Sequence, residues 1–351
     1  MRALQLVQWQ SDPELREVPE PEAGPGQVVV AVGAAGACHS DLHVMYDYPA
    51  GAVPYELPFT LGHENAGWVH QVGAGVRGFE VGQPVAVYGP WGCGVCTRCA
   101  VGAEIYCEDP AHAYVAGGGG GLGTDGGFAP YLLVPNQRFL FPLPDGLEPV
   151  QAAPLTDAAL TPYHAVKRSL PKLVPGSNTV VIGVGGLGHL GVQILKALSP
   201  TNVIAVDVKD NALELARTCG ADVTIRSGED AAAEIRDATG GKGADLVLDF
   251  VSAEQTLALA QKSVRLLGDL TIVGAGSGTL PVGFYTQPYE VSVQSVCWGS
   301  RPELGEVLQL AVRGLVTPEV TTFGLDDALD AYRQMQDGSL RGRAVIVPKE
   351  S

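Results

Sequence analysis

Four cysteines lie within one short segment of the chain, at Cys93, Cys96, Cys99 and Cys107. The gaps of two, two and seven residues between them allow consecutive thiolates to converge on one ion, while the chain wraps back to complete a tetrahedron. Zn²⁺ prefers this geometry, and four thiolates leave no open coordination position. We therefore predict a structural zinc site in this segment. An iron–sulfur cluster, which also uses four thiolates, is the alternative.

Three dispersed segments hold candidates for a second, open metal site. They read CHSDLH at 38–43, LGHENAGWV at 61–69 and LTDAALTPYHAV at 155–166. One cysteine, one histidine and one carboxylate would leave a coordination position for a substrate, as catalytic zinc sites do. Each residue also has a structural explanation, because a lone cysteine is usually a buried apolar side chain and Asp157 could cap a helix that begins there. The spacing alone leaves both interpretations open.

A glycine-rich turn provides the third group of candidates. Residues 183–188 read GVGGLG, follow the strand-like run Val180–Ile182 and open a helical pattern. The glycines permit a tight turn and close approach of a pyrophosphate, to which the start of the helix offers unpaired N–H groups. Asp207, nineteen residues past Gly188, can accept hydrogen bonds from both adenosine ribose hydroxyls. Because a carboxylate repels a 2′-phosphate, the pattern favours NAD over NADP, although Lys209 weakens this preference.

The elements that must position these residues fall into three stretches. Residues 1–150 contain short apolar runs interrupted by Gly and Pro, and we expect strands at Gln27–Val32, Trp68–Val72, Pro84–Tyr88 and Tyr131–Val134. In residues 151–294 strand-like runs alternate with helical patterns, which predicts an α/β fold with right-handed crossovers and a parallel sheet. These elements are Thr179–Gly183, Val203–Asp207, Leu246–Phe250 and Leu270–Gly274 as strands, and Asn211–Cys219 as a helix. Residues 295–351 return to short elements and end on the strand-like Ala344–Val347.

Composition limits the class of protein. The chain has 351 residues, which suggests two domains, and its 46% hydrophobic content excludes wholesale disorder. A net charge of −16 argues against binding to nucleic acids or anionic membranes. The N-terminus lacks the pattern of a signal peptide, and the longest apolar stretch, Thr179–Leu198, contains a lysine, a histidine and five glycines. With seven cysteines, four of them clustered, we expect a cytoplasmic protein without a disulfide framework. The run Gly117–Gly121 reads as a flexible surface loop.

Taken in their order along the chain, these motifs resemble the zinc-dependent medium-chain alcohol dehydrogenase family. The matching motifs are GHENAGWV, the four-cysteine segment, TDGGFAPY, GVGGLG with its acidic partner and the terminal GSLRGRAVIV, which together span essentially the whole chain. The segments PWGCGVC and PLTDAALTPYHA and the WG at 298–299 are most similar to bacterial NAD-dependent secondary-alcohol dehydrogenases. The resemblance implies a GroES-like, partly open β-barrel catalytic domain at 1–150 and 295–351. It also implies a doubly wound Rossmann domain that binds NAD at 151–294.

The resemblance also implies two zinc ions per chain and their ligands. Cys38, His63 and Asp157 match the catalytic zinc ligands, and the four clustered cysteines match the structural zinc ligands. Many relatives have cysteine at the position of Asp157, which keeps the −1 charge but supplies a harder oxygen donor. Glu64 matches a residue close to the metal that can exchange with water as a ligand, and Asp41 matches a carboxylate that orients His63.

Ser40 and His43 match a proton relay in the same family. Oxidation of an alcohol requires loss of its hydroxyl proton, and zinc lowers the pKa of that hydroxyl. Ser40 would take the proton, and a ribose hydroxyl of the cofactor would pass it to His43 near solvent, whose pKa suits this exchange. The remaining cofactor-binding positions are the residues of the turn (Gly183, Gly185, Gly186, Leu187 and Gly188) together with Asp207, His39, Thr161, Val273 and, at the pyrophosphate, Arg343.

The expected reaction is reversible hydride transfer between a secondary alcohol, or the matching ketone, and NAD. Primary alcohols or aldehydes, including aryl ones, are an alternative, and Tyr88, Trp91 and Trp298 are aromatic candidates near the substrate channel. A non-catalytic, zinc-stabilised NAD-binding regulator would leave the set of possible ligands and relay residues unexplained. A metal-free quinone reductase would lack the cysteines, and a serine hydrolase would need a G-x-S-x-G motif that the sequence lacks. The family resemblance implies a homo-oligomer, with a tetramer favoured over a dimer.

Overall fold

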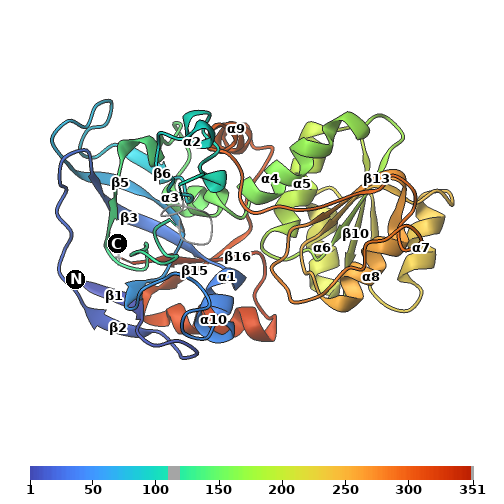
Figure 1. The fold of residues 1–351 in the computed structure, drawn as a ribbon, viewed down its shortest axis with the longest axis horizontal. Coiled ribbons are helices and arrows are strands. Elements are labelled where there is room, and N and C mark those ends of the chain that lie inside the picture. The colour runs from blue at the N-terminus through green and yellow to red at the C-terminus, as the bar shows by residue number, and fades with distance from the viewer. Residues whose placement is uncertain (110–118, 349–351) are drawn as a thin grey trace. The chain divides into compact units, whose positions relative to one another are not determined.

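Strands and helices alternate in the second half of the chain, and the strands form a six-stranded parallel sheet (Figure 1). The structure, a computed structural model, describes residues 1–109 and 119–348. The strand order is β11-β10-β9-β12-β13-β14, and every neighbouring pair is parallel. The bounds are β9 Asn178–Ile182, β10 Asn202–Asp207, β11 Val223–Arg226, β12 Ala244–Asp249, β13 Val264–Ile272 and β14 Ser292–Ser295. The order reverses at β9, and ligands of such sheets bind at this point, beyond the carboxyl ends of the strands.

Helices cover both faces of this sheet. The bounds are α4 Leu160–Ser169, α5 Gly188–Leu198, α6 Asp210–Thr218, α7 Ala231–Ala238 and α8 Glu254–Ser263. Right-handed crossovers place α5 and α6 on one face and α7 and α8 on the other. The strands bury their branched side chains, among them Val180, Ile204 and Val247, which have no exposed surface. The predicted α/β character and the parallel sheet are confirmed.

One strand of this sheet begins earlier than the sequence predicts. The pattern indicates a strand from Leu270, whereas β13 begins at Val264. Leu266 and Leu267 in its first half are exposed, and Leu267 has a left-handed backbone with φ of 64°. In the sequence, Arg265, Gly268 and Asp269 interrupt this half of the strand, so it lacks the continuous apolar run by which buried strands are found.

Two antiparallel arrangements form most of the remaining structure. One sheet has the order β15-β16-β3-β5-β6-β8 with β7 paired to β3, and the other has the order β2-β1-β4. Within the first sheet only β15 and β16 are parallel to each other. The bounds are β1 Arg2–Leu6, β2 Glu14–Glu17, β3 Val28–Ala37, β4 Phe59–Thr60, β5 Glu64–Val72, β6 Pro84–Val87, β7 Tyr131–Val134, β8 Leu140–Pro142, β15 Val320–Gly324 and β16 Arg343–Val347. The ten-residue strand β3 pairs with β16, β5 and β7 and so joins distant parts of the sequence.

The chain divides into two compact units. The first comprises Met1–Leu160, Gly299–Val312 and Pro318–Ser351, and the second comprises Thr161–Trp298 and Arg313–Thr317. The first unit also holds the helices α1 His39–Leu42, α2 Thr97–Ala100, α3 Pro149–Ala152, α9 Arg301–Val312 and α10 Ala328–Asp337, and a π-helical segment at His43–Asp47. Across the described residues, none of the helices has the length and apolar character needed to span a membrane.

The interpretation of Gly117–Gly121 as a flexible surface loop is wrong for its last three residues. Gly119, Gly120 and Gly121 are buried. A Cβ atom at Gly119 would lie 1.6 Å from the carbonyl oxygen of Gly89, so this glycine is required because two backbones touch there. Gly117 and Gly118 lie outside the described residues.

Candidate active site and zinc sites

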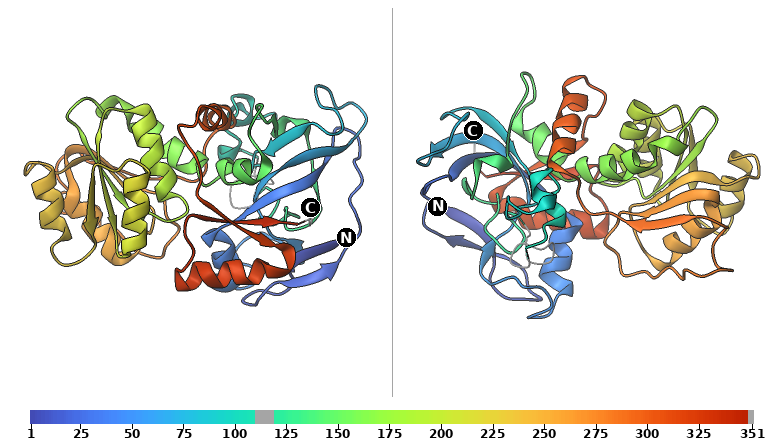
Figure 2. Two further views of the ribbon diagram at one scale, coloured as in Figure 1. Left: turned by 180° about the vertical axis from the view of Figure 1, so that it is seen from behind. Right: turned by 45° about the horizontal axis from the view of Figure 1, so that its top comes forward.

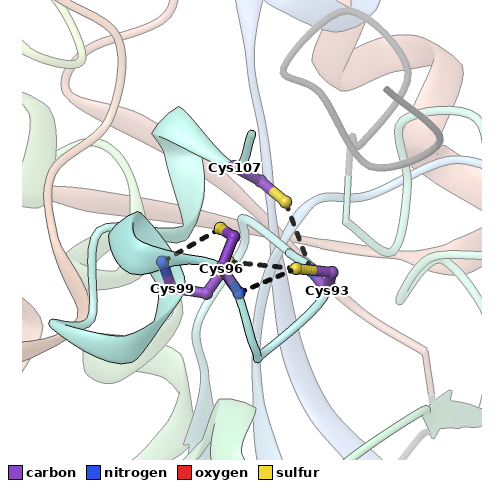
Figure 3. A group of neighbouring side chains, drawn as sticks. All are labelled: Cys93, Cys96, Cys99 and Cys107. Carbon is purple, nitrogen blue, oxygen red and sulfur yellow. Dashed lines mark hydrogen bonds between the residues drawn. The ribbon is translucent and has the colours of Figure 1, made fainter. Parts of the chain in front are cut away.

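The four clustered cysteines converge on one point in the first unit (Figure 3). Their sulfur atoms all lie within 4.8 Å of one another, and the Sγ atoms of Cys93 and Cys99 are 4.0 Å apart. Two thiolates on a tetrahedral zinc ion at about 2.3 Å lie about 3.8 Å apart, so the spacing fits zinc. All four are free cysteines, which agrees with a metal site and not with disulfides.

Backbone amides support the thiolate form of one member of this cluster, Cys96, whereas burial raises the pKa of the Cys99 and Cys107 thiols. Cys93 N donates to Cys107 Sγ at 3.3 Å, and the amides of Cys96 and Cys99 donate to the preceding cysteine sulfur at 3.4 Å. Hydrogen bonds from the amides of Glu108 and Cys99 lower the pKa of the Cys96 thiol to about 6. The chain therefore stabilises a ligand in the charge state that zinc binds.

A second group of possible ligands comprises Cys38, His63, Glu64 and Asp157, whose donor atoms also lie within 4.8 Å of one another. Cys38 follows β3, His63 immediately precedes β5, and Asp157 ends a short 3₁₀ turn at Ala153–Thr156. All four side chains are buried. His63 Nε2 lies 3.4 Å from Asp157 Oδ2, which matches the distance of about 3.4 Å between nitrogen and oxygen ligands of a tetrahedral zinc ion.

The alternative that Asp157 caps a helix is wrong. Helix α4 begins at Leu160, three residues later, and Asp157 lies beside His63 in the ligand group.

Burial alone would raise the pKa of the Cys38 thiol, but the charge of Arg343 and a hydrogen bond with His63 lower it to about 7. The site thus favours an anionic sulfur donor beside a histidine and a carboxylate, a donor set suited to zinc.

Arg343 holds Glu64 in place within this group. Arg343 Nε donates to Glu64 Oε2 at 3.0 Å, and a second guanidinium nitrogen bonds Oε1. Both oxygens of Glu64 are thereby engaged, which favours Cys38, His63 and Asp157 as the three protein ligands. Close packing depends on Gly36, because a Cβ atom there would lie 1.9 Å from Glu64 Oε2.

Asp41 lies directly behind His63, as the resemblance implied. Its Oδ1 is 2.9 Å from His63 Nδ1, and its Oδ2 accepts the backbone amide of Cys38 at 2.9 Å. A carboxylate on the far nitrogen of a ligating histidine fixes the ring orientation and tautomer. Asp41 therefore connects two of the possible ligands through one buried side chain.

The two residues of the predicted relay lie on the segment that follows Cys38. Ser40 Oγ is 3.3 Å from Cys38 Sγ, which places the hydroxyl at the edge of the ligand group. His43 is partly exposed, and its Nδ1 lies 2.5 Å from Asp47 Oδ2. His39 is exposed on the same short helix α1. This arrangement gives one hydroxyl near the ligands and one imidazole near solvent.

In the second unit, the glycine turn and Asp207 lie together at the carboxyl ends of β9 and β10. Val184 N donates to Asp207 Oδ2 at 2.8 Å, and Lys209 N donates to Oδ1 at 2.9 Å. Gly183 has φ of 86°, which a residue without a side chain adopts freely. A Cβ atom at Gly188 would lie 1.9 Å from the Gly183 carbonyl oxygen. A Cβ atom at Gly185 would meet nothing within 4 Å, so that glycine leaves open space beside the turn.

Other predicted residues are placed as follows. Thr161 is buried on α4, and Val273 follows β13, where its amide donates to the Asp249 carbonyl at 2.8 Å. Tyr88 is fully buried and its hydroxyl donates to the Gly299 carbonyl at 2.7 Å. Trp91 stacks on Phe139 at a ring distance of 6.0 Å, and Trp298 is buried. Burial and the hydroxyl partner of Tyr88 agree with a core role for that side chain.

Sequence reasoning missed one side chain of this site. Tyr332, on α10, donates its hydroxyl to Asp41 Oδ2 at 2.9 Å. Its neighbours on the helix, Ala331 and Met335, are buried, so its spacing predicts only a core position. The sequence contains no signal for a hydrogen bond across nearly three hundred residues.

The comparisons with known proteins match this description over the whole chain. Residues 24–145 match the alcohol dehydrogenase GroES-like domain, and residues 186–313 match the zinc-binding dehydrogenase domain. An NAD-dependent alcohol dehydrogenase of Sulfurisphaera tokodaii is 37% identical and covers 99% of this chain and 100% of its own length. The crystal structure of an alcohol dehydrogenase from Aeropyrum pernix has a TM-score of 0.91 at 34% identity, covering 99% of this chain and 100% of that chain. An acetophenone reductase from Geotrichum candidum, solved in complex with NAD, has a TM-score of 0.85 at 33% identity, covering 99% and 97%.

The fold is therefore a two-domain α/β dehydrogenase fold, with a GroES-like domain and a six-stranded parallel Rossmann sheet. The chain belongs to the zinc-containing medium-chain alcohol dehydrogenase family. The open group around Cys38 and the four-cysteine group together imply two zinc ions per chain, one catalytic and one structural. The iron–sulfur alternative has no support in these findings.

Proposed function

We propose that this chain catalyses reversible hydride transfer between a secondary alcohol, or the corresponding ketone, and NAD. The chain is an NAD-dependent alcohol dehydrogenase, and the proposal concerns the class of alcohol. The observation that carries it is the similarity to an acetophenone reductase along essentially the whole length of both chains, because the substrate in that protein's name is a ketone. Reduction of a ketone gives a secondary alcohol.

We also propose roles for the residues of the site. Zinc supplies a Lewis acid that makes a substrate hydroxyl more acidic. Cys38, His63 and Asp157 hold it, and Asp41 orients His63. Ser40 would accept the hydroxyl proton at the edge of the ligand group as it gives up its own, and His43, whose Nδ1 lies beside Asp47, would release a proton to solvent. Beside the ligands, the carboxylate of Glu64 balances the positive charge of Arg343, with which it is paired.

The cofactor proposal rests on the turn in the second unit. Its glycines and the N–H groups at the start of α5 would bind the pyrophosphate, and Asp207 would accept hydrogen bonds from the adenosine ribose hydroxyls. Thr161 and Val273 are proposed on the nicotinamide side, and His39 and Arg343 at the pyrophosphate. Arg343 also bonds Glu64 through two nitrogens of its guanidinium group.

A homo-oligomer, and specifically a tetramer, is also proposed. Strand β14 lies at the edge of the parallel sheet, and a group of exposed apolar side chains is found on the loop before it. Phe284 contacts both Tyr285 and Tyr289, and Tyr285 is 90% exposed. Exposed apolar side chains that cluster in this way are typical of interaction sites. We propose a cytoplasmic location, in line with seven free cysteines.

The test of the substrate class follows NADH consumption with a ketone and an aldehyde of equal carbon number. We expect kcat/KM for the ketone to exceed that for the aldehyde by at least tenfold. A higher value for the aldehyde would favour a primary-alcohol dehydrogenase. The non-catalytic regulator predicts NAD binding without turnover of either compound.

A further inference from the structure

Tyr332 is buried in the first unit and reaches the catalytic ligand group from the C-terminal part of the chain. It lies on α10, which packs beside α1 in the views of Figures 1 and 2. Only 2% of the side chain is exposed, and its ring centroid lies 6.2 Å from that of Phe128. Its hydroxyl donates to Asp41 Oδ2 at 2.9 Å. In the hydrogen bonds described, the acceptor of this hydroxyl is thus the carboxylate of Asp41, which lies behind His63.

Asp41 is a fully buried carboxylate with three hydrogen-bonding neighbours. The Cys38 amide and the Tyr332 hydroxyl meet Oδ2, and the His63 ring meets Oδ1, each at 2.9 Å. A buried carboxylate is costly unless such donors satisfy it. Of the three, only Tyr332 lies outside the segments that carry the ligands, so it fixes Asp41 from an independent element.

We propose that Tyr332 is a positioning residue for the catalytic zinc site. Its hydroxyl holds the Asp41 carboxylate and thereby sets the orientation of His63. The inference rests on the proposed assignment of Cys38, His63 and Asp157 as zinc ligands. Without the hydroxyl, Oδ2 retains one donor, the Cys38 amide, and the carboxylate can rotate about it. More of its charge is then available to His63, and the ring is held less firmly.

The protonation state of Tyr332 agrees with this role. Burial and the neighbouring Asp41 carboxylate raise the pKa of the phenol well above its ordinary value. The hydroxyl is consequently a proton donor throughout the pH range in which the enzyme is assayed.

The test compares Tyr332→Phe with Tyr46→Phe in the full-length, metal-loaded enzyme. Tyr46 is a matched control, because its hydroxyl also donates to an aspartate, Asp12 Oδ1 at 2.6 Å, but on the surface of the same unit. The readouts are the rate at which EDTA removes the catalytic metal and the visible spectrum of the cobalt-substituted site. Loss of a partner behind a metal-bound histidine typically costs about 10–100-fold in metal affinity or activity.

We expect Tyr332→Phe to release the catalytic metal about tenfold faster and to shift the cobalt bands, with the structural site unchanged. Tyr46→Phe should match the wild type in both readouts. In the Asp41→Asn background the Tyr332→Phe change should add little, because both act through one carboxylate. Unchanged release and spectrum, or full additivity with Asp41→Asn, would overturn the positioning role.

Two further outcomes are distinguishable from these. If Tyr332→Phe does not fold, Asp41→Asn tests the carboxylate through which Tyr332 acts, and it should release the catalytic metal faster than the wild type. A release rate equal to that of the wild type would contradict the proposal. A wild-type enzyme that holds only the structural metal would overturn the zinc assignment, and the positioning role with it. None of these readouts depends on which alcohol is the substrate, so a failed secondary-alcohol proposal would leave them unaffected.

Discussion

Arg343 and Glu64 form an enclosed ion pair beside the catalytic ligand group. Their side chains are 3% and 0% exposed, and Arg343 Nε lies 3.0 Å from Glu64 Oε2. The pair joins β16, near the C-terminus, to β5, whose first residue is Glu64 and follows His63 directly. The packing of the last strand and the charge at the metal site are therefore coupled.

Replacement of Arg343 by Met should destabilise the protein strongly. The variant leaves the Glu64 carboxylate buried without its cation, and loss of one partner of a buried pair typically costs about 3–5 kcal/mol. Urea unfolding at neutral pH measures the change in the free energy of unfolding. The control is Arg2→Ala, which breaks an exposed pair with Asp326 and should cause no measurable loss. Equal stability of Arg343→Met and the wild type would contradict the buried-pair interpretation.

Replacement of Cys96 by Ser should remove the structural zinc ion. A tetrahedral four-thiolate site loses its closed coordination when one ligand becomes a hydroxyl. We expect zinc content to fall by about one ion per chain, with a lower melting temperature. Cys297→Ser, at an exposed cysteine outside both groups, should retain two zinc ions. Elemental analysis of the purified variants reads both results, and unchanged zinc in Cys96→Ser would exclude this site.

Replacement of Asp207 by Gly should relax the preference for NAD over NADP. The carboxylate belongs to the last residue of β10 and is hydrogen-bonded to the Val184 amide, where a 2′-phosphate would meet its charge. We expect the ratio of kcat/KM for NAD to that for NADP to fall by about tenfold or more, equivalent to about 1.4 kcal/mol. Asp210→Gly, three residues away on α6, should keep the wild-type ratio. A wild type that prefers NADP would contradict the assignment of Asp207.

Replacement of His43 by Ala should slow turnover at neutral pH. General acid–base groups contribute about 10²–10⁴-fold, and we expect the lower end because His43 is partly exposed and solvent can replace it. The deficit should narrow as pH rises, since hydroxide then accepts the proton. Steady-state kcat across pH reads this, with His70→Ala as the control because His70 lies on β5 against Tyr131. A deficit that is the same at every pH would argue for a structural role.

Asp222 should make a pH-dependent contribution to stability. Burial raises the pKa of its carboxyl, but the Val203 amide and the Lys196 ammonium outweigh burial and lower it below the ordinary value. A folded-state pKa below the unfolded one stabilises the protein above about pH 4, and this contribution is lost as the pH falls further. Asp222→Asn should therefore be less stable than the wild type at neutral pH and equal to it in strong acid. A pH-independent difference in urea unfolding would contradict this.

The local chemistry of the sites could be predicted from the sequence because it depends on short spacings. The four cysteines and the glycine turn each lie in a single segment. The four sulfur atoms converge, and the turn lies beside Asp207. The parallel sheet was equally predictable, since its strands are continuous apolar runs. Glu64 and Asp41 were identified only through the family resemblance, because nothing in their spacing indicates burial beside a metal.

Contacts between distant segments could not be predicted. The partner of Arg343 is 279 residues away and that of Tyr332 is 291 residues away, so only the folded structure brings them together. The burial of Gly119 was missed for the same reason, because its neighbour Gly89 belongs to a different segment. Periodicity reports which residues are buried, but it does not report which hydroxyl or carboxylate they meet.

The most direct test of the central claim is the rate of NAD reduction with matched primary and secondary alcohols, both enantiomers included. The enzyme should carry two zinc ions per chain, verified beforehand. We predict rapid reduction of NAD with one enantiomer of a secondary alcohol, and slower reduction with the primary alcohol of equal carbon number. A primary alcohol that is oxidised faster than both secondary enantiomers, with both zinc sites filled, would contradict the proposed substrate class.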